Sequence, residues 1–124
     1  MTDRKVLIIE DDEALRNLYS TILENADIKV LSASRGKEGV DMALKHHPDV
    51  ILMDVMLPDF SGHDAMKKIR LDSWGKKATV IFLTNRSDAE SIVNAVEKGS
   101  EEYIIKSHVS NKELLNKVRS VMFS

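Results

Sequence analysis

Short apolar runs alternate with amphipathic stretches along the whole chain. Five runs, rich in β-branched residues and too uniform for half-exposed strands, predict strands buried on both faces of a parallel sheet: 5–9, 28–33, 50–53, 79–83 and 102–105. Between and after these runs, apolar residues recur at helical spacing behind capping residues, which predicts helices over 13–26 and 36–47 and helices beginning near 61, 87 and 110. This alternation calls for an α/β fold, a doubly wound five-stranded parallel sheet with five helices on its two faces.

Polar residues of particular types stand at the ends of four of the five runs. Glu10 and Asp11 follow the first run, Asp54 the third, Thr84 the fourth and Lys106 the fifth. Taken alone, Asp54 would be explained as the start of a turn. In an open α/β sheet, however, the carboxyl ends of the strands lie along one edge, so these side chains are expected to converge. Helix capping does not account for Glu10 and Asp11, whose adjacent carboxylates repel each other unless a cation lies between them.

Such a constellation suits phosphoryl chemistry. Carboxylate oxygens are the ligands that Mg²⁺ prefers, and this ion keeps several waters where few protein ligands are offered. A lysine and a hydroxyl beside the ion would neutralise and hydrogen-bond the oxygens of a phosphoryl group. Because no Ser, Cys or His stands at these strand tips, the available nucleophile is the carboxylate of Asp54, and its product would be an acyl phosphate.

The composition fits one small globular domain over residues 1–124. A net charge of −2 argues against a dedicated nucleic-acid surface, which usually shows a basic stripe. The chain has no cysteine, which fits a reducing cytoplasm. No apolar run is long enough for a membrane span, and none follows the first charged residues as in a signal peptide. We therefore expect a cytoplasmic protein without membrane insertion.

The four histidines do not form a metal site at this spacing. His46 and His47 are adjacent at a helix end, where they suit the helix dipole, and His63 and His108 are isolated near helix starts. We expect all four to be solvated at the surface. Trp74 stands in a turn over 72–75 and is expected to pack beneath that turn rather than to form a binding platform.

The chain resembles the receiver domains of two-component response regulators over essentially its whole length. The resemblance rests on Glu10-Asp11, Asp54, Met56-Leu57-Pro58, Gly62, Thr84, Tyr103 and Lys106. The hydroxyl and the lysine follow the phosphoacceptor by thirty and fifty-two residues, which is the spacing of the family. The resemblance implies a flavodoxin-like sheet of order 2-1-3-4-5, and a phosphoacceptor switch rather than an enzyme.

The resemblance also implies how the site takes up its phosphoryl group. Asp54 would accept it from a phosphohistidine of a sensor histidine kinase or of a histidine phosphotransfer protein. Asp11, Asp54 and the backbone carbonyl of Met56 would bind Mg²⁺, with Mn²⁺ as the alternative ion, and Glu10 would act through a coordinated water. Metal binding is thus expected of residues from two different strand ends.

The remaining site residues would carry the signal outward. Lys106 would pair with the phosphoryl oxygens, Thr84 would move in to hydrogen-bond them, and Tyr103 would turn inward, as in a two-state element biased by a local charge. The expected docking face, formed by the fourth helix, fifth strand and fifth helix, offers Glu90, Asn94, Glu97, Lys98, Glu101, Lys112 and Lys117. Its implied partners are a downstream effector protein or domain and a second copy of the chain; no effector domain and no direct nucleic-acid contact are expected within this chain.

Four residues depart from the family pattern or bear on the lifetime of the phosphoryl group. Ser107 stands where the family usually has proline, so the loop there is expected to differ. Asn85 stands where a small residue is usual, and it would crowd the phosphoryl pocket or hydrogen-bond within it. Met56 and Arg86 flank the path of an attacking water without activating it, which favours a comparatively long-lived phospho-Asp54.

Two other functions are open at this point. A degenerate receiver would bind partners without being phosphorylated; the departures at Asn85 and Ser107 allow this, but the full set of acidic, hydroxyl and lysine residues disfavours it. An Asp-nucleophile phosphatase would need a second Asp two residues after the nucleophile as general acid. Met56 occupies that position, which nearly excludes the phosphatase.

Overall fold

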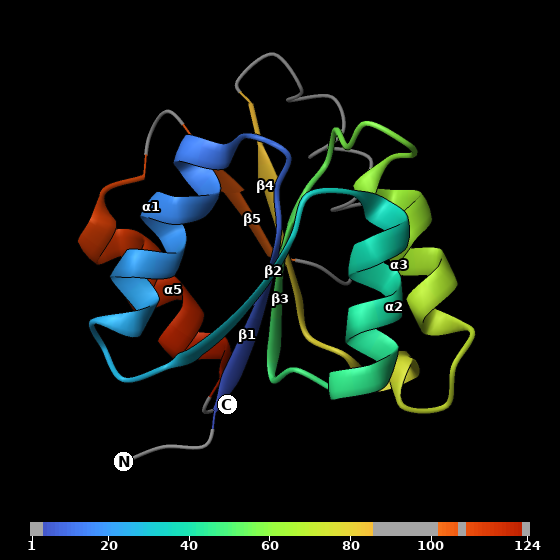
Figure 1. The fold of residues 1–124 in the computed structure, drawn as a ribbon. Helices are drawn as coiled ribbons and strands as arrows, with labels where there is room; N and C mark the ends of the chain where they lie inside the picture. The colour runs from blue at the N-terminus through green and yellow to red at the C-terminus, as the bar shows by residue number, and fades with distance from the viewer. Residues whose placement is uncertain (1–3, 86–101, 107–108, 123–124) are drawn as a thin grey trace.

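A five-stranded parallel sheet forms the centre of the computed structural model, which describes residues 4–85, 102–106 and 109–122 (Figure 1). Its strands are β1 (Lys5–Ile9), β2 (Lys29–Ala33), β3 (Val50–Asp54), β4 (Val80–Thr84) and β5 (Glu102–Ile105). They lie in the order β2-β1-β3-β4-β5, and every neighbouring pair is parallel. The predicted fold class and strand order are therefore confirmed.

Helices cover both faces of this sheet. Helices α1 (Glu13–Glu24) and α5 (Asn111–Met122) lie on one side, and α2 (Gly36–His46) and α3 (Gly62–Arg70) lie on the other, with the short helix η1 (Gly75–Lys77) after α3 (Figure 1). The fourth predicted helix, over Ala89, Ile92, Val93 and Val96, falls outside the described residues. Within the described ranges, no helix has the length and apolar character needed to cross a membrane.

The burial of the strands explains why the apolar runs do not alternate with polar residues. Every residue of β3 and β4 is buried, and residues 6–9 of β1 are fully buried. Successive side chains of a strand point to opposite faces, so each run supplies two cores. Val6 and Ile8 pack with the side chains of α1 and α5, whereas Leu7 and Ile9 pack with those of α2 and α3.

Three predicted helix caps are in place. The side chains of Asp12, Ser61 and Ser110 each accept a hydrogen bond from the backbone N–H three residues later, at 3.0, 3.1 and 3.1 Å. These bonds satisfy donors that a helix start leaves unpaired. Helix α2 ends at His46, one residue earlier than predicted, because His47 takes the left-handed conformation with φ of 49°.

Trp74 packs as predicted, and one of the histidines is its partner. The rings of Trp74 and His47 are stacked, with centroids 4.5 Å apart and planes 6° from parallel. Trp74 is half-buried and contacts the core cluster on the α2–α3 side. His47 is exposed, as expected for a surface histidine, but its ring also covers the indole.

Candidate metal-binding and phosphoacceptor site

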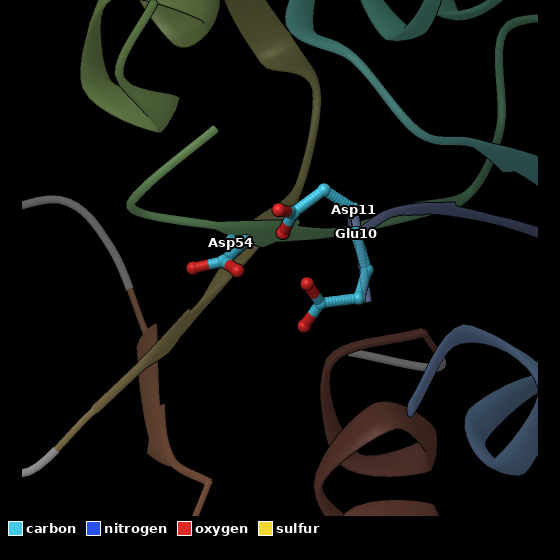
Figure 2. Close-up of side chains that lie close together, drawn as sticks. All are labelled: Glu10, Asp11 and Asp54. Atoms are coloured by element: carbon cyan, nitrogen blue, oxygen red, sulfur yellow. The ribbon is translucent and has the colours of Figure 1, made fainter. Parts of the chain in front are cut away.

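Three carboxylates meet at the carboxyl ends of β1 and β3. Glu10 and Asp11 follow β1, Asp54 ends β3, and the parallel pairing of Ile9 with Met53 brings these ends side by side. One oxygen from each carboxylate lies within 4.8 Å of the others, and Figure 2 shows how close together the three side chains lie. Glu10 and Asp54 are buried, at 0% and 4% exposure, whereas Asp11 is exposed.

Lys106 supplies the positive charge that the buried pair needs. Its Nζ donates to Asp54 Oδ2 at 2.7 Å and lies 2.5 Å from Glu10 Oε1. Its backbone N–H donates to the carbonyl of Thr84 at 2.9 Å, which holds the end of β5 against the end of β4. Burial alone would lower the pKa of Lys106, but its close contacts with the carboxylates of Asp54 and Glu10 outweigh burial and raise that pKa.

Glu10 is the member of the cluster whose negative charge is destabilised by its surroundings. Burial, followed by the neighbouring Asp54, raises the pKa of Glu10 to about 7. Its Oε1 has no suitably oriented hydrogen bond among the described residues, although Lys106 lies beside it. Two buried carboxylates, Glu10 and Asp54, thus share one ammonium group beside the exposed carboxylate of Asp11. This donor set fits a hard divalent cation such as Mg²⁺, which takes carboxylate oxygens together with waters.

The loop after Asp54 is fixed by backbone contacts. The N–H of Met56 donates to Asp54 Oδ1 at 3.0 Å, and the N–H of Gly62 donates to the carbonyl of Val55 at 2.7 Å. A Cβ atom on Gly62 would overlap the backbone carbonyl of Asp54, so only glycine allows this approach. The side chain of Met56 is 59% exposed. Packing against the phosphoacceptor therefore explains why glycine stands at position 62.

Asp59 ties the same loop to helix α2. Its carboxylate accepts hydrogen bonds from the N–H groups of Gly36 at 2.8 Å and Lys37 at 2.9 Å. Arg35 at the N-cap position of α2 supplies no side-chain cap. The carboxylate of Asp59, distant in sequence, therefore caps this helix start. Desolvation would raise the pKa of Asp59, but these N–H groups lower it below its usual value. The role of Asp59 leaves no pattern in the sequence, because its partners are over twenty positions away.

Thr84 is fully buried at the end of β4, where the sequence placed it. Its hydroxyl donates to the carbonyl of Asn85 at 3.2 Å. Asn85 itself is exposed. Arg86 and Ser107, which were predicted to affect phosphoryl lifetime and loop shape, lie outside the described residues, as does His108.

Tyr103 has a partner that the sequence analysis missed. The phenol oxygen of Tyr103 lies 2.9 Å from Nε2 of His63, which is half-buried at the start of α3. The expectation that His63 is merely a solvated surface residue is therefore wrong. A histidine directly after Gly62 carries no periodic signal of its own, and the contact depends on how β5 lies next to β4.

Comparisons with known proteins agree with this architecture. Residues 6–119 match the response regulator receiver domain family. The probable transcriptional regulator ycf27 of Porphyridium aerugineum is 31% identical over 122 residues, which are 98% of this chain and 49% of that protein. The chain spans about half the length of the curated relatives it matches.

Solved structures show the same fold. A putative response regulator from Chloroflexus aurantiacus J-10-fl has a TM-score of 0.89 at 25% identity, over 99% of this chain and 100% of that one. The receiver domain of the sensor histidine kinase PA1611 from Pseudomonas aeruginosa PAO1, solved with a magnesium ion in its active site cleft, has a TM-score of 0.88 at 24% identity, over 99% and 100% of the two chains. With its parallel sheet, its acidic strand ends and this family match, the chain belongs to the response regulator receiver domain family.

Proposed function

We propose that Asp54 accepts a phosphoryl group from a phosphohistidine of a partner sensor histidine kinase or histidine phosphotransfer protein. The observation that carries this proposal is the buried ion-pair cluster, in which Lys106 Nζ contacts both Asp54 and Glu10 beside the exposed Asp11. Family membership supports it, because this cluster occupies the strand ends where an α/β sheet binds its ligands.

The transfer forms one bond and breaks one. A carboxylate oxygen of Asp54 attacks the phosphorus, the P–N bond breaks, and its electron pair stays on that nitrogen of the donor histidine. With a proton on its other ring nitrogen, the histidine leaves as a neutral imidazole. Lys106, which contacts Asp54 Oδ2 before the reaction, then has the new phosphoryl oxygens within reach. The N–H of Met56, bonded to Asp54 Oδ1, fixes the orientation of the carboxylate for this attack.

Glu10, Asp11, Asp54 and the backbone carbonyl of Met56 would hold Mg²⁺, with Mn²⁺ as the alternative. When bound, the ion neutralises charge on the phosphoryl oxygens. The convergence of three carboxylates, of which two share one ammonium group, supports this site. The magnesium in the PA1611 receiver domain supports it by analogy of fold.

The signal would leave through a surface that includes β5 and α5. Thr84 would hydrogen-bond the phosphoryl group and Tyr103 would adopt its inward orientation, changing how this surface binds an effector protein or domain or a second copy of the chain. The matched relatives include transcriptional regulators of about twice the length of this chain. We place the protein in the cytoplasm, as a switch that assists its own phosphorylation and dephosphorylation.

Phosphorylation is tested with a small phosphodonor. The purified protein is incubated with acetyl phosphate and Mg²⁺, and its intact mass is measured. We expect one phosphoryl adduct that needs the divalent ion and is removed by hydroxylamine, as an acyl phosphate would be. Absence of the adduct, with the fold intact by circular dichroism, would instead favour the degenerate receiver that binds partners without phosphorylation.

A polar residue in place of Met56 should shorten the life of the adduct. Met56 is exposed next to Asp54 and offers water neither an acceptor nor a donor from its side chain. We expect Met56→Asn to speed dephosphorylation about tenfold, below the usual contribution of a well-placed general base. Arg86→Glu serves as the companion variant. The rate is measured by loss of the adduct after removal of phosphodonor; equal rates in wild type and both variants would rule out this role.

A further inference from the structure

Two aromatic side chains from different elements meet over a third. His63 lies in the first turn of α3, and Tyr103 lies on β5, forty positions away in sequence. Their side chains are joined by the 2.9 Å contact between Nε2 and the phenol oxygen. Both rings also pack on Phe82, with ring centroids 4.7 Å away for His63 and 5.2 Å away for Tyr103. The three side chains therefore form one cluster, which we call the aromatic clasp.

The aromatic clasp lies next to the elements proposed to carry the switch. Phe82 pairs with Tyr103 in the β4–β5 register, and Thr84 follows Phe82 by two residues on the same strand. Residues two apart in a strand point to the same face, so Phe82 and Thr84 share a face. Phe82 and Thr84 are both fully buried. The ring of Tyr103 thus packs on the same face of the sheet as Thr84, whose hydroxyl is proposed to hydrogen-bond the phosphoryl group.

His63, the second member of the aromatic clasp, lies close to the phosphoacceptor along the backbone. His63 directly follows Gly62, whose Cα packs so near the carbonyl of Asp54 that a Cβ atom would not fit. The N–H of Gly62 donates to the carbonyl of Val55, the next residue after Asp54. One short, tightly packed stretch of backbone thus connects Asp54 with His63.

We propose that His63 is a positioning residue that holds Tyr103 in its inward orientation before any phosphoryl group is present. This inference rests on the proposed function, in which the orientation of Tyr103 is part of the switch. A phenol both donates and accepts, so the contact forms with either neutral tautomer of the imidazole. One such hydrogen bond shifts a two-state orientation by roughly two- to tenfold. By linkage, a phosphoryl mimic that binds only the inward state then gains up to the same factor in apparent affinity for the chain.

The orientation of Tyr103 is measured directly by NMR with isotopic labelling of tyrosine rings. The chain has two tyrosines, and Tyr19 is buried in α1 on the opposite face, where it serves as an internal reference for the fold. Spectra are recorded without Mg²⁺ or phosphodonor. We expect His63→Leu to shift the Tyr103 population outward by roughly two- to tenfold. His63→Gln, which keeps a polar side chain, should restore most of the inward population.

Two outcomes of this first experiment would overturn the proposal. One is an unchanged Tyr103 signal in His63→Leu while the Tyr19 signals remain native. The other is equal displacement in His63→Leu and His63→Gln, which would assign the effect to ring packing on Phe82 and not to the hydrogen bond. Neither outcome depends on whether Asp54 is phosphorylated.

A second experiment tests the coupling to Asp54. Beryllofluoride with Mg²⁺, a mimic of the phosphoryl group, is titrated into wild type, His63→Leu, Tyr103→Phe and the double variant. We expect His63→Leu to weaken the binding of the mimic by roughly two- to tenfold when Tyr103 is present. In the Tyr103→Phe background, His63→Leu should leave the affinity unchanged. Equal affinity in wild type and His63→Leu would overturn the coupling. If the wild type itself fails to bind the mimic, the proposed function fails, and the first experiment still decides whether His63 positions Tyr103.

Discussion

Asp54→Asn should abolish the phosphoryl adduct while leaving the fold intact. The asparagine amide is not a nucleophile for phosphorus, so incorporation should fall by at least about a thousandfold. The structural contacts of the side chain largely survive, since the amide oxygen can still accept from the N–H of Met56. Lys106 also keeps Glu10 as a partner. Intact mass after incubation with acetyl phosphate and Mg²⁺ measures the loss, and circular dichroism verifies the fold.

Asp12→Asn is the matched control for this experiment. Asp12 is a neighbouring acid at the same edge of the sheet, but its carboxylate caps α1 by accepting from the N–H of Leu15. Asparagine caps a helix about as well as aspartate, so stability should change little. The control should keep its adduct. An adduct of equal size in Asp54→Asn would mean that another residue is the acceptor, and the proposed role of Asp54 would be wrong.

The fold was predictable because its strands are buried on both faces. In β1, β3 and β4 this burial removes the polar alternation and leaves apolar runs that are hard to mistake. The predicted bounds differ from the observed ones by at most about two residues, and the errors lie at ends such as His47, where one backbone conformation decides the last turn. Local chemistry thus set the elements, and right-handed connections favoured a doubly wound sheet. The strand order itself was predicted from the resemblance to receiver domains.

The site was predictable only as far as topology brings strand ends together. Glu10, Asp11, Asp54 and Lys106 each follow a strand, so a parallel sheet places them on one edge whatever their exact side-chain positions. His63 and Asp59 were missed for the opposite reason. Their partners, Tyr103 and the start of α2, belong to other elements, and no residue pattern encodes how a helix start or a loop lies over a neighbouring strand.

The same distinction applies to energetics. Adjacent acids in the sequence indicate that a cation is needed, but the sequence does not show how one ammonium group is shared. The structure gives Lys106 to both Glu10 and Asp54, and leaves Glu10 with a pKa of about 7. Because both buried carboxylates depend on the same ammonium group, removing Lys106 should have a large effect on stability.

Lys106→Met should lower the free energy of unfolding of the metal-free protein by about 3 kcal/mol at pH 8. This is the low end of the cost of breaking a buried ion pair, because the exposed Asp11 opens the cluster to solvent. Glu10 and Asp54 lose their common partner, and two buried carboxylates then face each other. Urea denaturation followed by circular dichroism measures the change. Lys112→Met, at an exposed position of α5, should change stability by less than about 0.5 kcal/mol.

The sign of the pH dependence follows from Glu10. Its folded pKa of about 7 lies above its ordinary value of 4.5, so between these values the folded state binds more protons than the unfolded state. Stability therefore falls as the pH rises through this window, and the loss is nearly complete at about pH 8. Lys106 lowers the pKa of Glu10, so in Lys106→Met this pKa should rise further and stability should go on falling to a higher pH. The difference in free energy of unfolding between wild type and variant should therefore be larger at pH 8 than at pH 6.

Mg²⁺ should reverse part of this deficit. An ion that binds the folded state alone stabilises it in proportion to the logarithm of its concentration over Kd. In wild type, Lys106 competes for Glu10 and Asp54, whereas in Lys106→Met the ion would meet these carboxylates without a rival cation. We therefore expect Mg²⁺ to stabilise the variant more than the wild type at pH 8. Equal stabilisation of both proteins would show that the ion does not use the carboxylates that Lys106 holds, and would contradict the metal site proposed for Glu10, Asp11 and Asp54.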